Sequence, residues 1–344
     1  MNINRRTLDR RGFLALTGTA AAGALLVSAC GSDDGPGGGG DGLSMQLNWI
    51  GDYGVLGECV ALEKGYYSEL GLNLRMQPGG PNIDPVSVLG AGGAESGQAS
   101  SPAAMLARSR GVPIKSFAAV SQRHPYAYFS LPRRPILEPK DMIGATIGVP
   151  ATGVVMLEAL LAANDIDSSQ VKTETVGSDW AVLASGRVDA MTGYLTSVQG
   201  RDVLGDTVHS LSLEDGGVNL YAYLYLCTDE VLESRSEALE ALVVGSSKGW
   251  DFARENPEEA VALLKKRFPN IDDAAQLESA NRISEYIWTD DTVEHGFGYQ
   301  SEQTWQAQID MWAELGQFQA EPPKATDVAT DAILDATSAE RVKA

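Results

Sequence analysis

Aromatic and hydrogen-bonding side chains stand where several predicted strands of this chain end and the next helix begins. Trp49 ends the first predicted strand, and Asp52 and Tyr53 follow it in the next loop. A tryptophan offers a flat apolar face on which a heteroaromatic ring stacks, and carboxyl or hydroxyl groups fix such a ring by hydrogen bonds. These residue types suit non-covalent capture of a small molecule, although Trp49 could instead cap the sheet as a core residue.

Further candidate residues occupy equivalent positions later in the chain, because ligands of α/β sheets bind outside the carboxyl ends of the strands. Gly79-Gly80-Pro81-Asn82 lets the backbone approach a ligand, or forms an ordinary turn. Thr152 and Gly153 begin a helix whose N-terminus favours an oxygen-rich or anionic group. The full set of candidate ligand-binding residues is Trp49, Asp52, Tyr53, Asn82, Ser100, Ser101, Gln122, Tyr126, Thr152, Gly153, Asp179, Trp180, Thr192 and Tyr194.

Several side chains also have a purely structural interpretation, and the sequence leaves both open. Ser100, Ser101 and Asp179 each precede a predicted helix and could cap it without touching a ligand. Cys59 and Cys227 could form one disulfide or remain two buried thiols, because nothing in their spacing forces a pair.

Composition and motifs argue against several other classes of protein. The 344 residues carry 26 Lys and Arg against 46 Asp and Glu, and the net charge of −20 argues against binding to nucleic acid. The chain has no Gly-x-Ser-x-Gly elbow, Walker loop, CxxC or HExxH motif. We therefore predict no catalytic residue, no metal site and no cofactor. The histidines are isolated from one another in the sequence: His124, His209 and His295.

The first 42 residues predict export followed by lipid anchoring. Arg10-Arg11 precedes an apolar run of about 16 residues, which is too short to span a bilayer, and Val27-Ser28-Ala29-Cys30 follows it. This order is typical of a signal peptide with a lipidation site at Cys30. A second arginine pair at Arg5-Arg6 leaves twin-arginine and ordinary export both open. We expect a signal peptide over 1–29, a Gly-rich tether over 30–42, and a mature protein outside the cytoplasm, anchored to the cell membrane by lipid on Cys30.

From Leu43 onward the sequence alternates apolar strands with helices, which is typical of an α/β fold with a mainly parallel sheet. The expected elements include a helix over 55–67, a buried strand over 114–120 and a helix over 257–268. Long helices dominate after Asp229. We expect the polar tail from Glu321 to be loosely attached, or to end in a short helix over 328–334. Two α/β halves suggest two lobes, with the second inserted into the first: 43–127 and 222–344 form lobe I, and 128–221 form lobe II. The aromatic segments 124–132 and 220–227 are the expected hinge crossings, or else two core strands.

Motifs along the chain resemble, in the same order, those of the extracellular receptors of ABC importers. Asn48-Trp49, followed by Ala61-Leu62-Glu63-Lys64-Gly65-Tyr66-Tyr67, is similar to the opening strand and helix of these receptors. Residues 137–149 resemble the segment that opens the second lobe, Gly186-Arg187-Val188-Asp189-Ala190 resembles a later strand, and 249–260 resemble the C-terminal helices. The resemblance spans about residues 44–268. It is closest to receptors for thiamine pyrimidine precursors and riboflavin, within the wider nitrate, sulfonate and taurine-binding group.

The resemblance implies a type-2 periplasmic-binding-protein fold, with two lobes, a hinge and a ligand cleft that closes on its ligand. It implies a monomeric receptor, not an enzyme, that delivers a small planar heterocycle to an ABC permease. Trp49 would then sandwich the ring together with Trp180 or Tyr194. The alternatives are a receptor for aliphatic sulfonate, taurine or nitrate, a sensing lipoprotein, and an enzyme like the fungal pyrimidine synthases, whose cysteine-rich pattern this chain lacks.

The chain departs from the receptors for pyrimidine precursors at two places. Val55 stands where many of them have a histidine at the start of the first helix, and the segment 195–199 lacks the carboxylate that many of them carry. These departures weaken the expectation of a pyrimidine-specific carboxylate contact and favour a flavin or another planar heterocycle.

Overall fold

The computed structural model of the protein describes residues 41–343, except 81–82, 199 and 206. The predicted signal peptide and the lipidation site at Cys30 lie outside the described residues. Among those described, no helix combines the length and the apolar character that crossing a bilayer requires.

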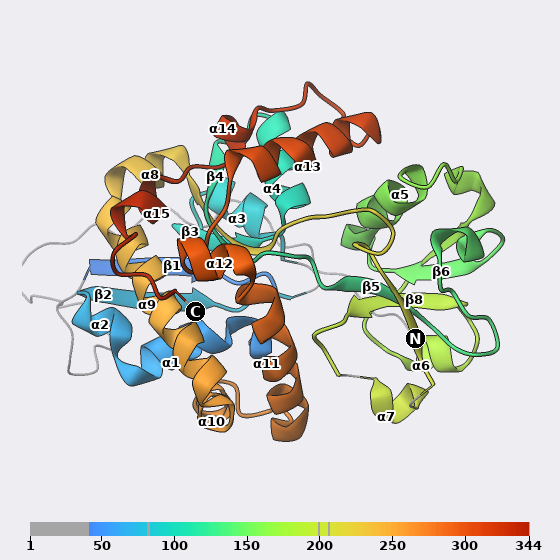
Figure 1. The fold of residues 1–344 in the computed structure, drawn as a ribbon, viewed down its shortest axis with the longest axis horizontal. Coiled ribbons are helices and arrows are strands. Elements are labelled where there is room, and N and C mark those ends of the chain that lie inside the picture. The colour runs from blue at the N-terminus through green and yellow to red at the C-terminus, as the bar shows by residue number, and fades with distance from the viewer. Residues whose placement is uncertain (1–40, 81–82, 199, 206, 344) are drawn as a thin grey trace, which may run out of the picture. The chain divides into compact units, whose positions relative to one another are not determined.

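The described strands form two sheets of five strands each (Figure 1). The first sheet has the order β2-β1-β3-β10-β4 and the second has the order β7-β6-β8-β5-β9. The strands of the first sheet are β1 (Asp41–Gln46), β2 (Leu72–Gln77), β3 (Ser96–Ala99), β4 (Ile114–Ser121) and β10 (Ala222–Thr228). Those of the second are β5 (Tyr126–Ser130), β6 (Thr146–Val149), β7 (Lys172–Thr175), β8 (Ala190–Tyr194) and β9 (His209–Ser212).

Both sheets follow one pattern, in which a single strand runs against the other four. β1 pairs parallel with β2 and β3, and β6 pairs parallel with β7 and β8. The reversed strands are β10, which lies between β3 and β4, and β5, which lies between β8 and β9. Each reversed strand is the first that the chain forms after it crosses from the other sheet. We use lobe I and lobe II for the elements built on the first and second sheet.

Helices cover both faces of the first sheet, because its strands bury side chains in alternating directions. Leu43 and Tyr225 face α1, α9 and α10, whereas Leu224 and Leu226 face α3, α4 and α13. Figure 1 shows α1 and α9 along one side of this sheet and α3 and α4 along the other. The helices of lobe I are α1 (Leu56–Lys64), α2 (Tyr66–Glu69), α3 (Pro85–Gly90), α4 (Ser101–Ser109), α8 (Asp229–Ser234), α9 (Ser236–Glu255), α10 (Pro257–Arg267), α11 (Asp273–Ile287), α12 (Asp290–His295), α13 (Glu302–Glu314), α14 (Ala325–Val328) and α15 (Ala332–Ala336), with a 3₁₀ turn η1 (Tyr53–Val55) before α1.

Lobe II is smaller and carries shorter helices. Its helices are α5 (Val154–Ala162), α6 (Ala181–Ala184) and α7 (Arg201–Leu204), with 3₁₀ turns η2 (Pro139–Met142), η3 (Ala151–Gly153) and η4 (Ser168–Gln170). In Figure 1, α5 and α6 lie on opposite sides of the second sheet. The apolar core on the α5 side is continuous with the α4 and α13 side of lobe I, whereas Leu183 of α6 belongs to a separate small cluster.

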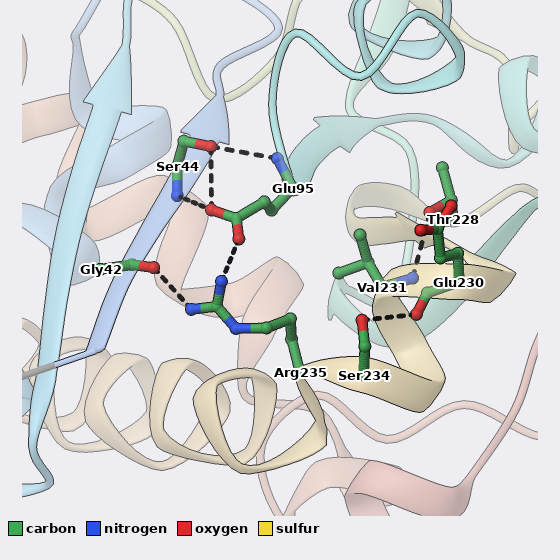
Figure 2. A network of polar contacts seen from close by, with 8 residues as sticks. All are labelled: Gly42, Ser44, Glu95, Thr228, Glu230, Val231, Ser234 and Arg235. Atoms are coloured by element: carbon green, nitrogen blue, oxygen red, sulfur yellow. Dashed lines mark hydrogen bonds and ion pairs between the residues drawn. The ribbon is translucent and has the colours of Figure 1, made fainter.

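A charged network fixes the first strand to the start of α9 (Figure 2). The Glu95 carboxylate accepts from the backbone N–H of Ser44 at 2.9 Å and from its hydroxyl at 3.1 Å. Arg235 pairs with the same carboxylate and donates to the Gly42 carbonyl at 2.5 Å. In the same view, Thr228 caps α8 by accepting from the Val231 N–H. The network holds the amino end of β1, whose residues Asp41 and Gly42 lie within the segment 30–42 expected as a tether.

The C-terminal tail is packed, so the expectation that it is loosely attached from Glu321 onward is wrong. Val328 and Ile333 are buried in the core. The backbone of Ala329 forms a β-bridge with Ser116 of β4, and Phe297 donates its N–H to the Val342 carbonyl at 3.0 Å. The tail is polar in overall composition, and its few apolar residues nevertheless cover β4.

The described cysteines are two buried free thiols, Cys59 and Cys227. Burial raises the pKa of the Cys227 thiol to about 12 and raises that of Cys59 further. Both side chains are therefore protonated at neutral pH and behave as small core residues.

One buried carboxyl group lies in the core of lobe I. Glu58 of α1 has no exposed surface, and its Oε1 accepts from the Gln98 amide at 3.2 Å and from the Tyr225 hydroxyl. Oε2 has no hydrogen-bond partner among the described residues. Burial raises the pKa of Glu58 to about 7, because an ionised carboxylate is costly where water is excluded.

Glu58 should make the stability of the protein depend on pH. The unfolded chain ionises Glu58 near pH 4.5, whereas the folded protein ionises it near 7, so the favourable contribution is complete below about 4.5 and is lost as the pH rises through 7. We expect Glu58→Gln, which keeps the Oε1 acceptor, to raise the free energy of unfolding relative to the parent at pH 8, by on the order of 2–3 kcal/mol, and to change it little at pH 4.5. Urea denaturation at the two pH values measures this, and an equal effect at both would contradict it.

Candidate functional site

An aromatic cluster forms where β8 ends and β5 begins. The antiparallel register places Tyr126 directly opposite Tyr194, so the two rings share one face of the second sheet. His124, two residues before Tyr126, lies edge-on to both rings at centroid distances of 5.9 Å. Tyr223 of β10 reaches the same place, 6.4 Å from Tyr194. We call His124, Tyr126, Tyr194 and Tyr223 the aromatic cluster. His124 and Tyr126 belong to the crossing 124–132, Tyr223 belongs to the crossing 220–227, and Tyr194 ends β8 of lobe II.

Tyr53 of η1 joins lobe I to the loop that follows β8. Its hydroxyl lies 3.0 Å from the Thr196 hydroxyl in a buried hydrogen bond, and its backbone N–H donates to the Gln276 side chain of α11 at 2.7 Å. Arg282 of α11 donates to the Leu195 carbonyl at 3.0 Å. Lobe I therefore holds the end of β8 through both a hydroxyl pair and a guanidinium.

The backbone of Tyr223 is strained at this place. Its φ is +49°, in the left-handed region that residues other than glycine rarely adopt. The neighbouring Gly54 is close enough that a Cβ there would lie 2.9 Å from the Tyr223 ring. The unusual backbone directs the Tyr223 side chain toward η1 and Tyr194, and a small residue in η1 leaves room for it.

Asp52 places a carboxyl group beside the aromatic cluster. Its Oδ1 accepts from the Gly54 N–H at 2.9 Å and so caps η1. Burial raises the pKa of Asp52 to about 6. A Cβ at Gly54 would lie 3.1 Å from Asp52 Oδ1 and 2.9 Å from the Tyr223 ring, which places the carboxyl group next to the cluster. The negative charge of Asp52 contributes to raising the pKa values of Tyr53, Tyr194 and Tyr223.

The titratable groups of the aromatic cluster are neutral at physiological pH. Burial lowers the pKa of His124 to about 4, and its Nδ1 accepts from the Tyr126 N–H at 3.3 Å. Burial also raises the pKa of Tyr194 to about 12 and that of Tyr126 further. The site thus offers ring faces, hydroxyls and one carboxyl group. This combination suits binding of a flat polar molecule and supplies no activated nucleophile.

The Trp49 loop lies at the carboxyl end of β1. Trp49 is 38% exposed, and its carbonyl accepts from the Gly79 N–H at 3.0 Å. A Cβ at Gly79 would lie 2.3 Å from the Leu47 carbonyl oxygen, so glycine permits this close approach of two loops. An indole exposed to this extent is not a fully buried core residue capping the sheet.

Three predicted site residues use their polar atoms within the protein. Ser101 donates from both its hydroxyl and its backbone to the Tyr221 carbonyl. The Gln122 amide donates to the carbonyls of Ala119 and Tyr299, at 2.8 Å each. Asp179 is exposed and caps α6 by accepting from the Ala181 N–H at 2.9 Å. The structure thus gives these groups internal partners.

Trp180 lies on the opposite face of the second sheet from the aromatic cluster. Its ring contacts Phe129 edge-on at 5.4 Å, and a Cβ at Gly193 would lie 2.7 Å from it. Phe129 and Gly193 point away from Tyr126 and Tyr194, because successive side chains of a strand alternate between faces. Of the two residues predicted to face Trp49, Tyr194 is therefore the one in the aromatic cluster.

The remaining predicted residues are Thr192, Ser100 and Gly153, which the structure describes, and Asn82 and Thr152, which it does not describe in full. Thr192 is buried and shares the sheet face of Tyr194, and Ser100 is half-buried before α4 and makes no capping bond with its hydroxyl. Gly153 contacts the aromatic cluster, because a Cβ there would lie 2.1 Å from the Tyr126 hydroxyl oxygen. Asn82 and the side chain of Thr152 lie outside what the structure describes.

The list of candidate residues predicted from the sequence omits several residues that the structure places at the site. His124 and Thr196 carried no local signal, whereas Tyr223 was visible only as one of the aromatic residues of the 220–227 crossing. Gln276 and Arg282 reach the site from α11, which follows Tyr53 by more than two hundred residues. A pattern in one sequence does not reveal a contact across such a separation.

Two cavities adjoin the site without including the tyrosines of the cluster. One, of about 210 Å³, borders His124 on the side of α13, where Gln308 lines it. The other, of about 350 Å³, is lined by Leu47 and Phe268 among other residues. The described tyrosines of the cluster pack against one another in this conformation, so a ligand would have to separate them.

The fold and the sequence together define the class of protein. The sequence model of the NMT1/THI5-like family matches residues 54–260, and the chain belongs to this family. The aliphatic sulfonate-binding protein SsuA of Escherichia coli has a similar structure, with a TM-score of 0.64 and 14% identity over 83% of this chain and 91% of that one. The prediction of a type-2 periplasmic-binding-protein fold is confirmed.

Two curated relatives are similar over most of their length. A formylaminopyrimidine-binding protein of Halalkalibacterium halodurans is 29% identical, over 83% of this chain and 88% of the relative. The riboflavin-binding protein RibY of Chloroflexus aurantiacus is 26% identical, over 76% of this chain and 78% of the relative. The predicted resemblance to this group of receptors is confirmed.

The contact between Gly153 and Tyr126 makes a specific packing prediction. We expect Gly153→Ala to lower the free energy of unfolding by about 1–3 kcal/mol, because the new methyl group overlaps the Tyr126 hydroxyl. Tyr126→Phe removes that oxygen, so the double variant should recover most of the loss. Urea denaturation of the four proteins measures the coupling. Gly177→Ala is the matched control, because nothing lies within 4 Å of its Cβ position; equal losses in the single and double variants would contradict the contact.

Proposed function

We propose that this protein is an extracytoplasmic receptor that captures a small planar heterocycle and delivers it to an ABC permease. The observation that carries this proposal is the aromatic cluster, which joins lobe II to both crossings and lies against Tyr53 of lobe I. Flat rings bind well among aromatic side chains with a few oriented polar groups. The two curated relatives, named for a formylaminopyrimidine and for riboflavin, support the same ligand class.

The ligand would bind between the lobes, at the carboxyl ends of β1 and β8. Tyr194, Tyr126 and Trp49 supply ring surface, and Thr192 and Ser100 supply hydroxyls. Access requires the Tyr53–Thr196 contact to open, and closure over the ligand restores it. A ligand that both lobes touch then favours the closed state by its additional contacts in that state.

A sulfonate is a less suitable ligand, although the structure resembles a sulfonate-binding protein. Asp52 places a half-buried carboxyl group beside the aromatic cluster, and its charge would repel an anion there. Arg282, which lies at the contact between the lobes, is already bonded to Glu278 at 2.8 Å and to the Leu195 carbonyl. Like charge in a desolvated site opposes binding, so a neutral or cationic heterocycle fits better.

An enzymatic function like that of pyrimidine synthases receives little support from the described side chains. Cys59 and Cys227 are buried thiols with raised pKa values, which makes them poor nucleophiles. No described group of three or more His, Cys, Asp and Glu residues is arranged to hold a metal ion. Binding and release of an unchanged ligand requires none of these groups.

The N-terminal region supports membrane anchoring in the proposed function. Cys30 follows the small residues Val27-Ser28-Ala29 in the order of a lipidation site. Residues 31–40 are rich in glycine, and a flexible chain of ten residues spans about 17 Å. Such a tether would keep the receptor close to a permease and allow it to turn freely.

Lipidation is tested by substituting the acceptor. We expect Cys30→Ser to move the expressed protein from the membrane fraction to the soluble exported fraction, because a serine offers no thiol to acylate. Immunoblots of fractionated cells measure the distribution. Ser32→Ala, just beyond the acceptor, should leave the protein with the membrane, and an unchanged distribution of the Cys30 variant would show that lipid on Cys30 is not the anchor.

The ligand class is tested by a thermal-shift screen of the 43–344 fragment against riboflavin, thiamine, formylaminopyrimidine, hydroxymethylpyrimidine and alkanesulfonates. A true ligand at about 100 times its dissociation constant adds ~2.7 kcal/mol of stability. We expect Trp49→Ala to weaken its binding about 10-fold or more in calorimetry, because ring stacking and burial are lost. Leu137→Ala, an exposed apolar residue of lobe II, is the control. Stabilisation by sulfonates alone would contradict the proposed function.

A further inference from the structure

Asp52 has one carboxyl oxygen that the protein does not use. Oδ1 accepts from the Gly54 N–H at 2.9 Å, whereas no hydrogen bond links Oδ2 to another described residue. The residue keeps part of its surface accessible although its surroundings exclude most water. An accessible carboxyl oxygen with no partner in the protein can accept a hydrogen bond from a bound molecule.

The groups that face Asp52 do not compensate its charge. The phenols of Tyr53, Tyr194 and Tyr223, from η1, β8 and β10, have raised pKa values, and so has the Cys59 thiol of α1. His124, which contacts Tyr194, is neutral because burial lowers the pKa of its imidazole to about 4.

The described cations near this region already have partners. Arg267 of α10 pairs with Glu63 at 3.1 Å, and Arg282 of α11 pairs with Glu278 at 2.8 Å. The carboxylate of Asp52 therefore lies among neutral hydroxyls and paired charges, next to the rings that would hold a planar ligand.

We propose that Asp52 determines ligand specificity by accepting hydrogen bonds from the N–H edge of an aminopyrimidine-type ring, a role that rests on the proposed function. The exocyclic amino group of a neutral aminopyrimidine presents N–H donors, one of which the unused Oδ2 of Asp52 can accept. The two carbonyl oxygens that flank the single N–H of a flavin's pyrimidine ring are acceptors, and the oxygens of a sulfonate carry negative charge, so Asp52 disfavours both.

The proposal has a defined pH dependence. The free protein protonates Asp52 below about pH 6, whereas an N–H donor binds the ionised form, so binding near pH 6 expels a proton and affinity falls as the pH drops through 6. Glu58 titrates near pH 7 elsewhere in lobe I, bonded to Gln98 and Tyr225, and it could shift stability without touching the ligand. Glu58→Gln is therefore the control for pH effects that do not come from Asp52.

The experiment measures binding of formylaminopyrimidine, riboflavin and an alkanesulfonate by calorimetry at pH 7.5 and pH 5. Asp52→Asn keeps the Oδ1 cap on Gly54 and replaces one acceptor oxygen by a donor amide. We expect the parent to prefer formylaminopyrimidine, and Asp52→Asn to bind it about 10- to 100-fold more weakly at pH 7.5. The variant should also lose most of the pH dependence, whereas Glu58→Gln should retain both affinity and pH dependence.

A measurement on the parent protein alone guards against a variant that does not fold. Titrations at pH 6 in two buffers of different ionisation enthalpy give the number of protons expelled on binding, and we expect close to one-half for the parent. Equal affinity of parent and Asp52→Asn, a preference for riboflavin, or no proton expelled would overturn the role of Asp52 and leave the proposed function intact. Failure of the parent to bind either heterocycle would overturn both.

Discussion

The insertion of β10 between β3 and β4 is the constraint on which the two-lobed structure depends. When the chain returns from lobe II, this strand pairs antiparallel with both neighbours and closes the first sheet. Because its side chains alternate, one face carries Tyr223 and Tyr225 toward α1 and α9, and the other carries Leu224 toward α3 and α4. A single strand thus completes the core of lobe I, bonds Glu58 through Tyr225 and delivers Tyr223 to the aromatic cluster.

Glu58 and Asp52 are carboxyl groups on neighbouring elements, and they differ in how many hydrogen bonds the protein donates to them. Glu58 receives two donors from strands of its own lobe, and its pKa near 7 leaves a large fraction neutral at physiological pH. Asp52 receives one backbone donor, and its pKa near 6 leaves it mostly ionised under the same conditions. The first is a core group whose Oε1 accepts from two side chains of the protein, whereas its buried Oε2 has no partner among the described residues. The second keeps a charge and an accessible oxygen beside aromatic rings, which is the arrangement of a recognition group.

The fold was predictable from the sequence because its elements are strongly periodic, and the failures have identifiable causes. The strand at 114–120 and the helix at 257–268 appear within one residue of their expected bounds, as β4 and α10. The helix expected over 55–67 is interrupted because Gly65 adopts a left-handed conformation and ends α1. The tail was misjudged as loosely attached because its overall composition is polar, although Val328 and Ile333 of the alternative helix over 328–334 do bury against lobe I.

The candidate site was predictable to a smaller extent, for a different reason. Strand ends indicated Asp52, Tyr53 and Tyr194, since position along a strand is local information. Which face Trp180 occupies depends on the packing of α6 against Phe129, and no local pattern encodes it. The α11 contacts of Tyr53 and Leu195 join segments that are remote in sequence and meet only after both lobes have formed.

The polar bonds between the lobes are individually weak, although the apolar core on the α5 side of lobe II is continuous with lobe I. A buried hydroxyl pair such as Tyr53–Thr196 contributes about 0.5–1.5 kcal/mol, and a charged donor on a carbonyl, such as Arg282 on Leu195, about 1.5–3 kcal/mol. Shifting a two-state balance from 1:99 to 99:1 requires a differential of ≈ 5.5 kcal/mol. In the proposed receptor, a ligand that lies on the rings of the cluster and bonds Asp52 would supply interactions of that order when both lobes surround it. Opening would break few polar bonds, and a bound ring would make the closed geometry dominant.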